Sequence, residues 1–309
     1  MTKNKQYHVA VPATTANIGS GFDVLGLSLA LYNEAVFTAE EGLSFSDLTI
    51  TAEGEGTDEM AYGPDNIVCQ AMKRTAETLG KPLPGGHLHL INRIPFARGM
   101  GSSSAAIVAG VGLANLYFGE PLSKKEMLSI AADMEGHPDN AAPAVLGGFV
   151  ISMMDEQGVR GETIPVSPEW QAVVAVPDFE LLTKEARAVL PDSYSRKDAV
   201  HNIGAVSFLL AAFFQKKPEY LRIGLQDRIH VPYRLTLIPG GLEVVEQAEK
   251  AGAYGATISG SGSTMIAFTD RIHAEPVGIA MQQGFASAGI SSRIMVLDFD
   301  RLGVHRLKA

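Results

Sequence analysis

Cysteine is almost absent from this sequence, because Cys69 is the one cysteine in 309 residues. A single cysteine cannot form a disulfide within the chain, and the sequence has no Cys-x-x-Cys pair or Cys/His cluster with the spacing of a zinc site. The composition therefore excludes a disulfide-stapled fold and a structural zinc site, and it fits a reducing compartment. We interpret Cys69 as a small core residue.

An excess of basic residues and a long apolar run are also missing. The 25 Lys and Arg residues are scattered and stand against 34 Asp and Glu, for a net charge of −9. A nucleic-acid surface must neutralise phosphates, so we expect no nucleic-acid partner. No segment approaches the roughly 18 to 20 unbroken apolar residues of a membrane span, and the amino terminus has no long apolar signal region. The sequence predicts a cytoplasmic protein without a membrane partner.

The length and the apolar fraction allow two domains. The chain has 309 residues, of which 46% are apolar, and this is enough for a substantial core. One compact domain is the alternative. The boundary is expected between residues 155 and 170, which divides the chain into residues 1–165 and 166–309.

Strand and helix patterns alternate along the chain, which predicts an α/β (α+β) protein. Asp65 is placed to cap one helix, and Ser123 with Glu126 forms a capping box at the start of another. A loop rich in Thr, Asn, Gly and Ser is expected over residues 12–23. The expected strands are 7–11, 22–37, 48–52, 85–95, within 149–166, 171–177, 255–259, 263–268 and 293–299; the expected helices are 65–79, 103–118, 123–136, 183–189, 195–215, 242–250 and 274–284.

Residues 95–106, PFARGMGSSSAA, carry two glycines and three serines between a predicted strand and a predicted helix. This arrangement aims unpaired backbone N–H groups and the positive end of a helix at one point, which suits an anion. Glycine lets the backbone approach closely, and the serine hydroxyls add hydrogen bonds or a metal contact. No lysine follows the second glycine, so this is neither Gly-x-x-x-x-Gly-Lys-Ser/Thr nor Gly-x-Gly-x-x-Gly. Taken alone, the loop is equally consistent with a helix start that merely packs against a sheet.

Three segments together resemble the GHMP small-molecule kinases, the family of galactokinase and mevalonate kinase. PFARGMGSSSAA is similar to the family's phosphate loop Pro-x-x-x-Gly-Leu-Gly-Ser-Ser-Ala, with Met100 in place of leucine. PATTANIGSGFD at 12–23 and GATISGSGSTMIAF at 255–268 match two further family motifs in the right order, although Ser263 stands where many members have proline. The resemblance spans residues 7 to about 297. It implies an N-terminal βαβ-type domain with a left-handed crossover, a C-terminal ferredoxin-like α/β sandwich, and an active site between them.

The resemblance implies that ATP and Mg²⁺ bind along the phosphate loop. Glu135 matches the family's metal carboxylate and Ser103 its hydroxyl ligand, and Mg²⁺ prefers such hard oxygen ligands. The alternative for Glu135 is an exposed charge at a helix end, where the dipole disfavours it. Asn66 and Val68 lie in the segment that flanks adenine in the family, although packing explains Val68 equally well. The nucleotide contacts implied by position are Pro95, Ala97, Arg98, Gly99, Met100, Gly101, Ser102, Ser103, Ser104, Ala105, Asn66, Gly260, Ser261 and Gly262.

Within the family, PATTANIGSGFDVLGLSL, EGHPDNAAPAVLGG and TKEARAVLP are most similar to the branch that phosphorylates the side-chain hydroxyl of L-homoserine. Such a zwitterionic alcohol needs a carboxylate for its ammonium, guanidinium groups for its carboxylate and amides near its hydroxyl. By resemblance, Asp23 takes the ammonium, Arg187 and Arg234 the carboxylate, and Asn17 and Asn140 the hydroxyl region. Taken singly, Asp23 is as well explained as a turn cap and each arginine as a solvated charge.

The expected chemistry is phosphoryl transfer by positioning and electrostatics, with Glu135, Ser103 and Asn140 as the catalytic candidates. Mevalonate-kinase-like members use an aspartate base, and Asp139 lies near its place. We expect no side-chain base, and we treat Asp139 and His137 as supporting groups.

Two other functions remain open from the sequence. One is a GHMP kinase for a different alcohol, such as a mevalonate-pathway or sugar substrate, which would have no use for Asp23 and two arginines. The other is a catalytically inactive relative that binds ligand and regulates a partner, which would not need Glu135. The resemblance further implies a role in threonine synthesis and a homodimer.

Overall fold

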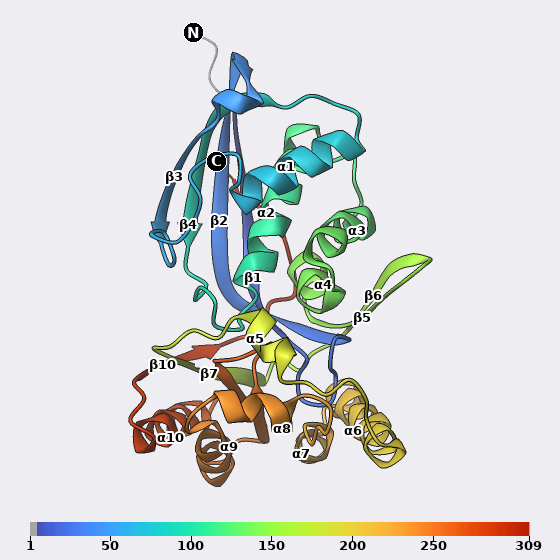
Figure 1. The fold of residues 1–309 in the computed structure, drawn as a ribbon, viewed down its shortest axis with the longest axis vertical. Coiled ribbons are helices and arrows are strands. Elements are labelled where there is room, and N and C mark those ends of the chain that lie inside the picture. Colours follow the sequence, from blue (N-terminus) through green and yellow to red (C-terminus); the bar gives the residue numbers. More distant parts are fainter. Residues whose placement is uncertain (1–4, 309) are drawn as a thin grey trace.

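A computed structural model describes residues 5–308 of the chain, which form a mixed α/β structure with two β-sheets. The first sheet lies among the helices of the upper part of the molecule, and the second lies below it (Figure 1). None of the helices within these residues is long and apolar enough to cross a bilayer.

The first sheet is built on two long antiparallel strands, β1 (Lys5–Ala16) and β2 (Leu25–Ser44). Within residues 5–308 it has seven strands, with the path β11-β1-β2-β4-β3, while β5 pairs with both β2 and β6. β3 and β4 pair in parallel, so the chain between them must cross over. The other strands are β3 (Thr49–Gly54), β4 (Pro84–Asn92), β5 (Phe149–Asp155), β6 (Gly158–Ile164) and β11 (His305–Arg306).

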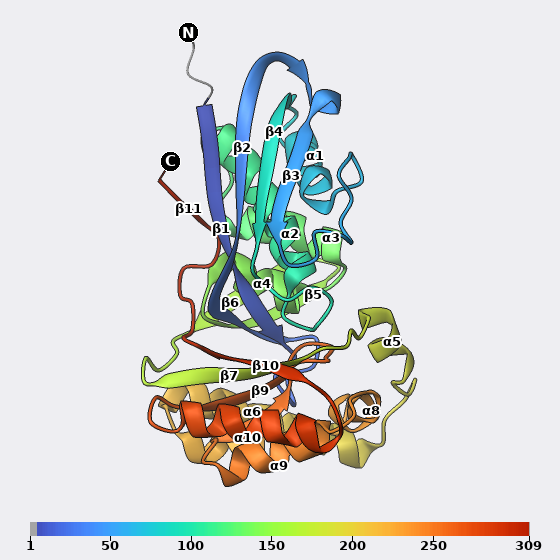
Figure 2. The ribbon, with the colours of Figure 1, turned by 90° about the vertical axis from the view of Figure 1, so that its left-hand side faces the viewer.

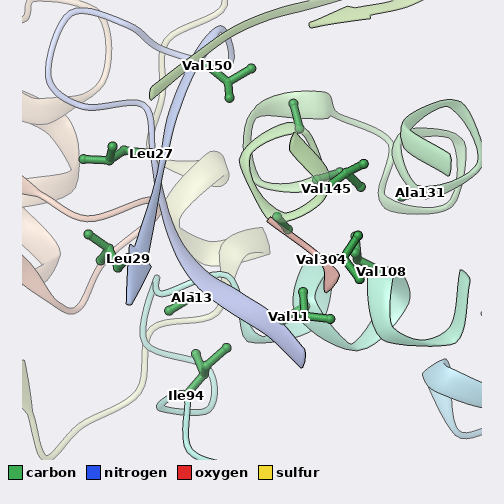
Figure 3. Close-up of a cluster of buried hydrophobic side chains, with 14 of the residues drawn as sticks. Val11, Ala13, Leu27, Leu29, Ile94, Val108, Ala131, Val145, Val150 and Val304 are labelled. Atoms are coloured by element: carbon green, nitrogen blue, oxygen red, sulfur yellow. The ribbon is translucent and has the colours of Figure 1, made fainter. Parts of the chain in front are cut away.

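Four helices belong to this part of the molecule: α1 (Ile67–Thr78), α2 (Ser102–Tyr117), α3 (Lys124–Glu135) and α4 (Pro138–Leu146). Helix α2 is buried along most of its length, and its small residues let neighbours approach closely. A Cβ on Gly110 would lie 2.3 Å from the carbonyl oxygen of Val68 in α1. Apolar side chains from β1, β2, α2, α3 and α4 fill the core, as Val11, Leu27 and Val108 illustrate (Figure 3).

The second sheet has the strand order β10-β7-β9-β8, and all of its pairings are antiparallel. This order and its two helical connections are those of the expected ferredoxin-like sandwich. The strands are β7 (Trp170–Pro177), β8 (Gly255–Ile258), β9 (Met265–Asp270) and β10 (Ser292–Leu297); the longer helices are α6 (Arg196–Gln215), α9 (Gly241–Lys250) and α10 (Ala274–Ser287). Helices α9 and α10 pack side by side below this sheet (Figure 2).

The two sheets share a continuous core. Phe213 of α6 stacks on Phe149 of β5, with ring centroids 4.1 Å apart, and it meets Trp170 and Phe268 of the second sheet at their edges. The last strand, β11, returns to pair with β1 of the first sheet. The relative position of the two sheets is therefore fixed by packing, and segments from both can form one site.

Most expected helices and strands are confirmed, with the following differences. Pro12–Ala16 continue strand β1, so the loop expected over residues 12–23 is wrong in its first part. Asn66 and not Asp65 caps α1, because the Asn66 side chain accepts the Val68 N–H. Helix α4 and strand β11 were not predicted. The remaining short elements are α5 (Thr183–Ala188), α7 (Leu221–Gly224), α8 (Val231–Arg234) and the 3₁₀ turns Phe45–Asp47, Pro218–Tyr220 and Leu235–Leu237, of which only α5 was expected.

Candidate active site

A cavity of about 210 Å³ lies where the two parts of the molecule meet, and it brings together most of the expected site residues. Its walls come from the phosphate loop, the junction of α3 and α4, helix α5, helix α8 and the glycine loop after β8. The expected residues that line it are Asn17, Ala97, Arg98, Gly99, Gly101, Ser102, Ser103, Ser104, Glu135, Asn140, Arg187, Arg234, Gly260 and Ser261.

The phosphate loop depends on glycine at two positions. Gly99 and Gly101 have φ angles of +74° and +71°, a conformation that residues with a Cβ rarely adopt. A Cβ on Gly101 would lie 1.9 Å from Thr14 Oγ1, and one on Gly99 would lie 2.3 Å from the carbonyl oxygen of Ser259. Any larger residue would therefore displace the loop.

Among residues 5–308, no group accepts a hydrogen bond from the backbone N–H groups of residues 96–104 in this loop, whereas its carbonyl groups are engaged. The carbonyl oxygens of Arg98, Gly99 and Met100 accept hydrogen bonds from Thr264 N (3.2 Å), Ser259 Oγ (2.7 Å) and Thr14 N (3.1 Å). Gly101, the residue before α2, has no side chain to cap the first N–H groups of that helix. The start of α2 lines the cavity, and its N–H groups and helix dipole would suit an anion there.

Several expected nucleotide residues take a different place. Arg98 donates to the carbonyl oxygens of Pro177 (3.1 Å) and Phe96 (2.7 Å), so its guanidinium joins the loop to the second sheet. The Met100 side chain is fully buried in the core. Pro95 and Gly262 are also buried outside this cavity, and Ala105 lines the adjoining cavity described below.

Glu135 ends helix α3 at the cavity wall, and its Oε2 is buried without a hydrogen-bond partner among the described residues. The buried Ser104 Oγ is likewise unpartnered there, and Ser103 lines the same wall. Burial raises the pKa of the Glu135 carboxyl, which the neighbouring Ser104 hydroxyl and His137 oppose only in part. A buried carboxylate oxygen beside a free hydroxyl fits a hard divalent cation such as Mg²⁺.

The start of α4 carries a pair of acidic and basic groups beside this carboxylate. His137 Nδ1 lies 2.6 Å from Oδ1 of the buried Asp139, and this hydrogen bond is the main cause of a raised pKa for His137. Asn140 Oδ1 accepts a hydrogen bond of 2.8 Å from Thr14 Oγ1. Pro138 occupies the first turn of α4, where its missing N–H costs nothing.

Asp23 and Arg187 form a bidentate ion pair, with distances of 2.8 and 3.1 Å. Arg187 lines the cavity and comes from α5, whereas Asp23 comes from the loop after β1. That loop holds Asn17 and Asp23 at positive φ, which costs free energy and is typical of functional sites. Asn17 fixes the loop, because its Oδ1 accepts the Asp23 N–H and its Nδ2 donates to the Gly260 carbonyl oxygen.

Arg234 ends α8 and is 1% exposed, yet it lines the cavity. Its Nε donates to the carbonyl oxygen of Ala186 (3.1 Å) and its Nη1 to that of Gly260 (3.2 Å). Burial lowers the pKa of Arg234 to about 10, so the guanidinium stays charged at neutral pH. A buried cation held by neutral carbonyl groups is expected to attract an anion.

A second cavity of about 310 Å³ adjoins the first and shares Phe96, Ser102 and Ser103 with it. Asn66 and Val68, which the resemblance places beside adenine, line this cavity. The Asn66 side chain is engaged locally, since it caps α1 and donates to the Ala61 carbonyl oxygen.

Three polar residues in or beside the cavity were not found from the sequence. Thr183 lines the cavity, although Arg187 is the only residue of its segment TKEARAVLP to which the sequence assigned a role. Thr14 packs against Gly101, and the His230 ring hydrogen-bonds to the Arg234 guanidinium. An isolated Thr or His gives no spacing signal, so only the fold brings these residues to the site.

Two family models match the chain. Residues 66–148 match the N-terminal domain of the GHMP kinases, and residues 209–286 match the C-terminal domain. Among curated proteins, the homoserine kinase of Carboxydothermus hydrogenoformans is 46% identical over 93% of this chain and 92% of its own length. The homoserine kinase of a Picosynechococcus species is 42% identical over 96% and 97%.

Solved structures give the same similarity. Homoserine kinase from Cytophaga hutchinsonii superposes with a TM-score of 0.90 at 31% identity, over 99% of this chain and 98% of that one. A mevalonate kinase from L. major, solved with R-mevalonate, superposes with a TM-score of 0.72 over 95% of both chains at 14% identity, which supports the fold alone.

Proposed function

We infer, because this chain belongs to the homoserine kinase branch of the GHMP kinase family, that it transfers the γ-phosphoryl group of ATP to the side-chain hydroxyl of L-homoserine. The products are ADP and O-phospho-L-homoserine. The observation that carries this proposal is that one cavity is lined by the phosphate loop from one half of the molecule and by two arginines from the other half. One of these, Arg187, is paired with Asp23, which does not itself line the cavity.

The phosphate end of the cavity suits the triphosphate of ATP, with adenine in the adjoining cavity beside Asn66. The free N–H groups of the loop and the dipole of α2 would bind phosphate oxygens. Glu135 and Ser103 would hold Mg²⁺, which neutralises charge on the phosphoryl oxygens when it is bound.

The other end of the cavity suits the zwitterion. Arg234 and Arg187 would bind the substrate carboxylate, and Asp23 would bind the ammonium in exchange for part of its ion pair with Arg187. Asn17 and Asn140 also line this cavity, and they would orient the hydroxyl toward the phosphoryl group.

We propose no general base for the hydroxyl proton. Asp139 is already hydrogen-bonded to His137, and a loose phosphoryl-transfer transition state asks little of a base. The hydroxyl oxygen forms its bond to phosphorus as the bond to the ADP oxygen breaks, and the proton passes to the transferred phosphoryl group.

We further propose that the enzyme serves threonine synthesis in the cytoplasm as a homodimer. We also keep the division into residues 1–165 and 166–309. The two sheets support it, whereas β11 crosses back to the first sheet.

The deciding experiment is a coupled ADP-release assay with Mg·ATP and L-homoserine, mevalonate, galactose or L-threonine, with Arg234→Leu and Glu135→Gln alongside. We expect turnover confined to L-homoserine, loss of affinity for it in Arg234→Leu and loss of rate in Glu135→Gln. Turnover on another alcohol would support the kinase activity and reject L-homoserine as the substrate. ATP binding without turnover on any alcohol would favour a regulatory relative.

A further inference from the structure

His230 is a fully buried titratable residue that the proposed reaction does not use. It immediately precedes α8, the short helix that ends with Arg234. The Asp227 carboxylate fixes this turn, because its Oδ2 accepts the N–H groups of His230 (2.6 Å) and Val231 (2.7 Å). The backbone of this turn therefore fixes the positions from which the side chains of His230 and Arg234 extend.

The hydrogen bonds of the ring define one tautomer. His230 Nε2 lies 2.8 Å from the carbonyl oxygen of Gly19, and a carbonyl can only accept. Nε2 must therefore carry the hydrogen. Nδ1 lies 3.3 Å from Nη1 of Arg234, which can only donate, so Nδ1 must be the acceptor. Both contacts are satisfied by the neutral ring with its hydrogen on Nε2.

Arg234 is consequently held only by neutral groups. Its Nε and Nη1 are bound by the carbonyl oxygens of Ala186 and Gly260 and by the His230 ring. Among the described residues, no carboxylate oxygen lies within 4.0 Å of its nitrogens, and none of them accepts a hydrogen bond from Nη2. The geometry fixes the guanidinium and leaves its charge and Nη2 for a ligand in the cavity.

The His230 ring also contacts the 17–23 loop, which carries Asp23, the residue expected to bind the substrate ammonium. His230 stacks on Phe22 with ring centroids 5.1 Å apart, and Phe22 also lies 5.2 Å from Cζ of Arg234. Gly19 and Phe22 belong to the loop that carries Asn17 and Asp23. One side chain thus contacts both the expected carboxylate-binding arginine and the loop of the expected ammonium-binding aspartate.

We propose that His230 is a positioning residue for the amino-acid substrate, whose neutral ring holds Arg234 and the 17–23 loop in register so that the two ends of a zwitterion are bound together. The inference rests on the proposed function, because it assigns the substrate carboxylate to Arg234.

A charged ring would break this arrangement. A proton on Nδ1 would face the Nη1–H of Arg234, so the hydrogen bond would be lost and two cations would adjoin. The charged groups that face the ring are Arg234, Asp227, whose Oδ2 is 3.8 Å from Nε2, and more remotely Asp23. Burial is the main cause that lowers the pKa of His230, to about 4, so the ring stays neutral at working pH.

Two substitutions of His230, each made in the full-length protein, separate the hydrogen bond to Arg234 from the hydrogen bond to Gly19. Asparagine places its amide near Nδ1, where its oxygen can accept from Arg234. Glutamine places its amide near Nε2, where its N–H can donate to Gly19. We expect His230→Gln to raise the KM for L-homoserine about tenfold with kcat and the KM for ATP within about threefold, and His230→Asn to recover much of that loss.

A substrate analogue without the carboxylate tests whether His230 changes the KM through the carboxylate bound by Arg234. 3-Aminopropan-1-ol has the hydroxyl and the amine, so its inhibition constant should be the same in the wild type and in His230→Gln. His201→Gln is the matched control, because His201 also contacts a backbone carbonyl, that of Gln226 at 3.0 Å, outside the cavity. Equal loss for both ligands, or an unchanged KM for L-homoserine, would overturn the proposal.

The tautomer can be read in the wild-type protein by ¹⁵N NMR of the histidine rings, which keeps the proposal testable even where a variant does not fold. We expect one ring with its hydrogen on Nε2, uncharged to about pH 5. Finding the hydrogen on Nδ1, or a charged ring at neutral pH, would overturn it. A wild type without turnover on L-homoserine would instead reject the proposed function, so the two failures are distinguishable.

Discussion

The two ends of the central cavity are built in different ways. The phosphate end is mostly backbone, from one contiguous stretch whose glycines at positive φ leave N–H groups free. The substrate end is mostly side chains, from the 17–23 loop, α5 and α8: Arg187 and Arg234 line it, and Asp23 adjoins it through its ion pair with Arg187. A backbone site recognises any phosphate and fails when a Cβ is added, whereas a side-chain site selects a charge pattern and fails when a charge is removed.

Glu135 is the exception at the phosphate end, and its removal should have the largest effect. Glu135→Gln keeps the shape and removes the one charged group expected to hold Mg²⁺, so we expect kcat to fall about 10³-fold. Rates should be measured across a Mg²⁺ titration. Asp133→Asn on the same helix is the control, because Asp133 lies in an exposed pair with Arg74. A kcat within threefold of the wild type would remove Glu135 from the metal site.

Gly101→Ala tests whether the phosphate end depends on backbone shape. The new Cβ would lie 1.9 Å from Thr14 Oγ1 and 3.1 Å from Asn140 Oδ1, at a φ of +71°. We expect a loss of about 3 kcal/mol in the free energy of unfolding, with a raised KM for ATP. Gly119→Ala is the matched control, since Gly119 has a φ of +84° and nothing within 4 Å, and it should lose only about 1 kcal/mol. Equal losses in urea unfolding would show that close packing under Gly101 contributes nothing.

Arg187→Gln tests the charge pattern of the substrate end. The variant leaves Asp23 without its bidentate partner and removes one group for the substrate carboxylate. We expect the KM for L-homoserine to rise about 30-fold with an unchanged KM for ATP. Arg160→Gln removes a similarly exposed pair with Asp155, 2.7 Å away, and should change neither constant. A rise in the KM for ATP of the same size would mean that Arg187 serves both ends of the cavity.

The contrast also explains what the sequence could predict. The phosphate loop gave a local signal because its residues are consecutive, although this signal alone was equally consistent with a helix start that packs against a sheet. The charged residues of the substrate end were identified only through the family resemblance, since nothing in the spacing of Asp23 and Arg187 foretells an ion pair across 164 positions. His230 was missed for the same reason, because its partner Gly19 is 211 positions away.

Errors in the predicted elements have local causes. Thr14 and Thr15 suggested a loop, yet both are fully buried in β1 opposite Ser28 and Leu27. Helix α4 was hidden by two prolines, of which Pro138 occupies the first turn, where proline is tolerated. In β1 tertiary packing overrode the local pattern, whereas in α4 the position of Pro138 is compatible with a helix.

The free energy of unfolding should depend on pH with opposite signs for the buried groups at the two ends of the cavity. At the substrate end the pKa of His230 falls from 6.5 to about 4 on folding, so the unfolded chain binds the extra proton and stability falls as pH drops through this window. The slope is at most about 1.4 kcal/mol per pH unit for one proton, and His230→Gln should remove it. At the phosphate end the pKa of Glu135 is raised, so its charge destabilises the native state at higher pH, and Glu135→Gln should be the more stable protein at neutral pH without divalent metal. Urea unfolding from pH 4 to 8 in a chelator measures both effects, because the two substitutions should change the wild-type slope in opposite directions. Changes of the same sign would refute the assignment of one buried neutral base and one buried acid to opposite ends of the cavity.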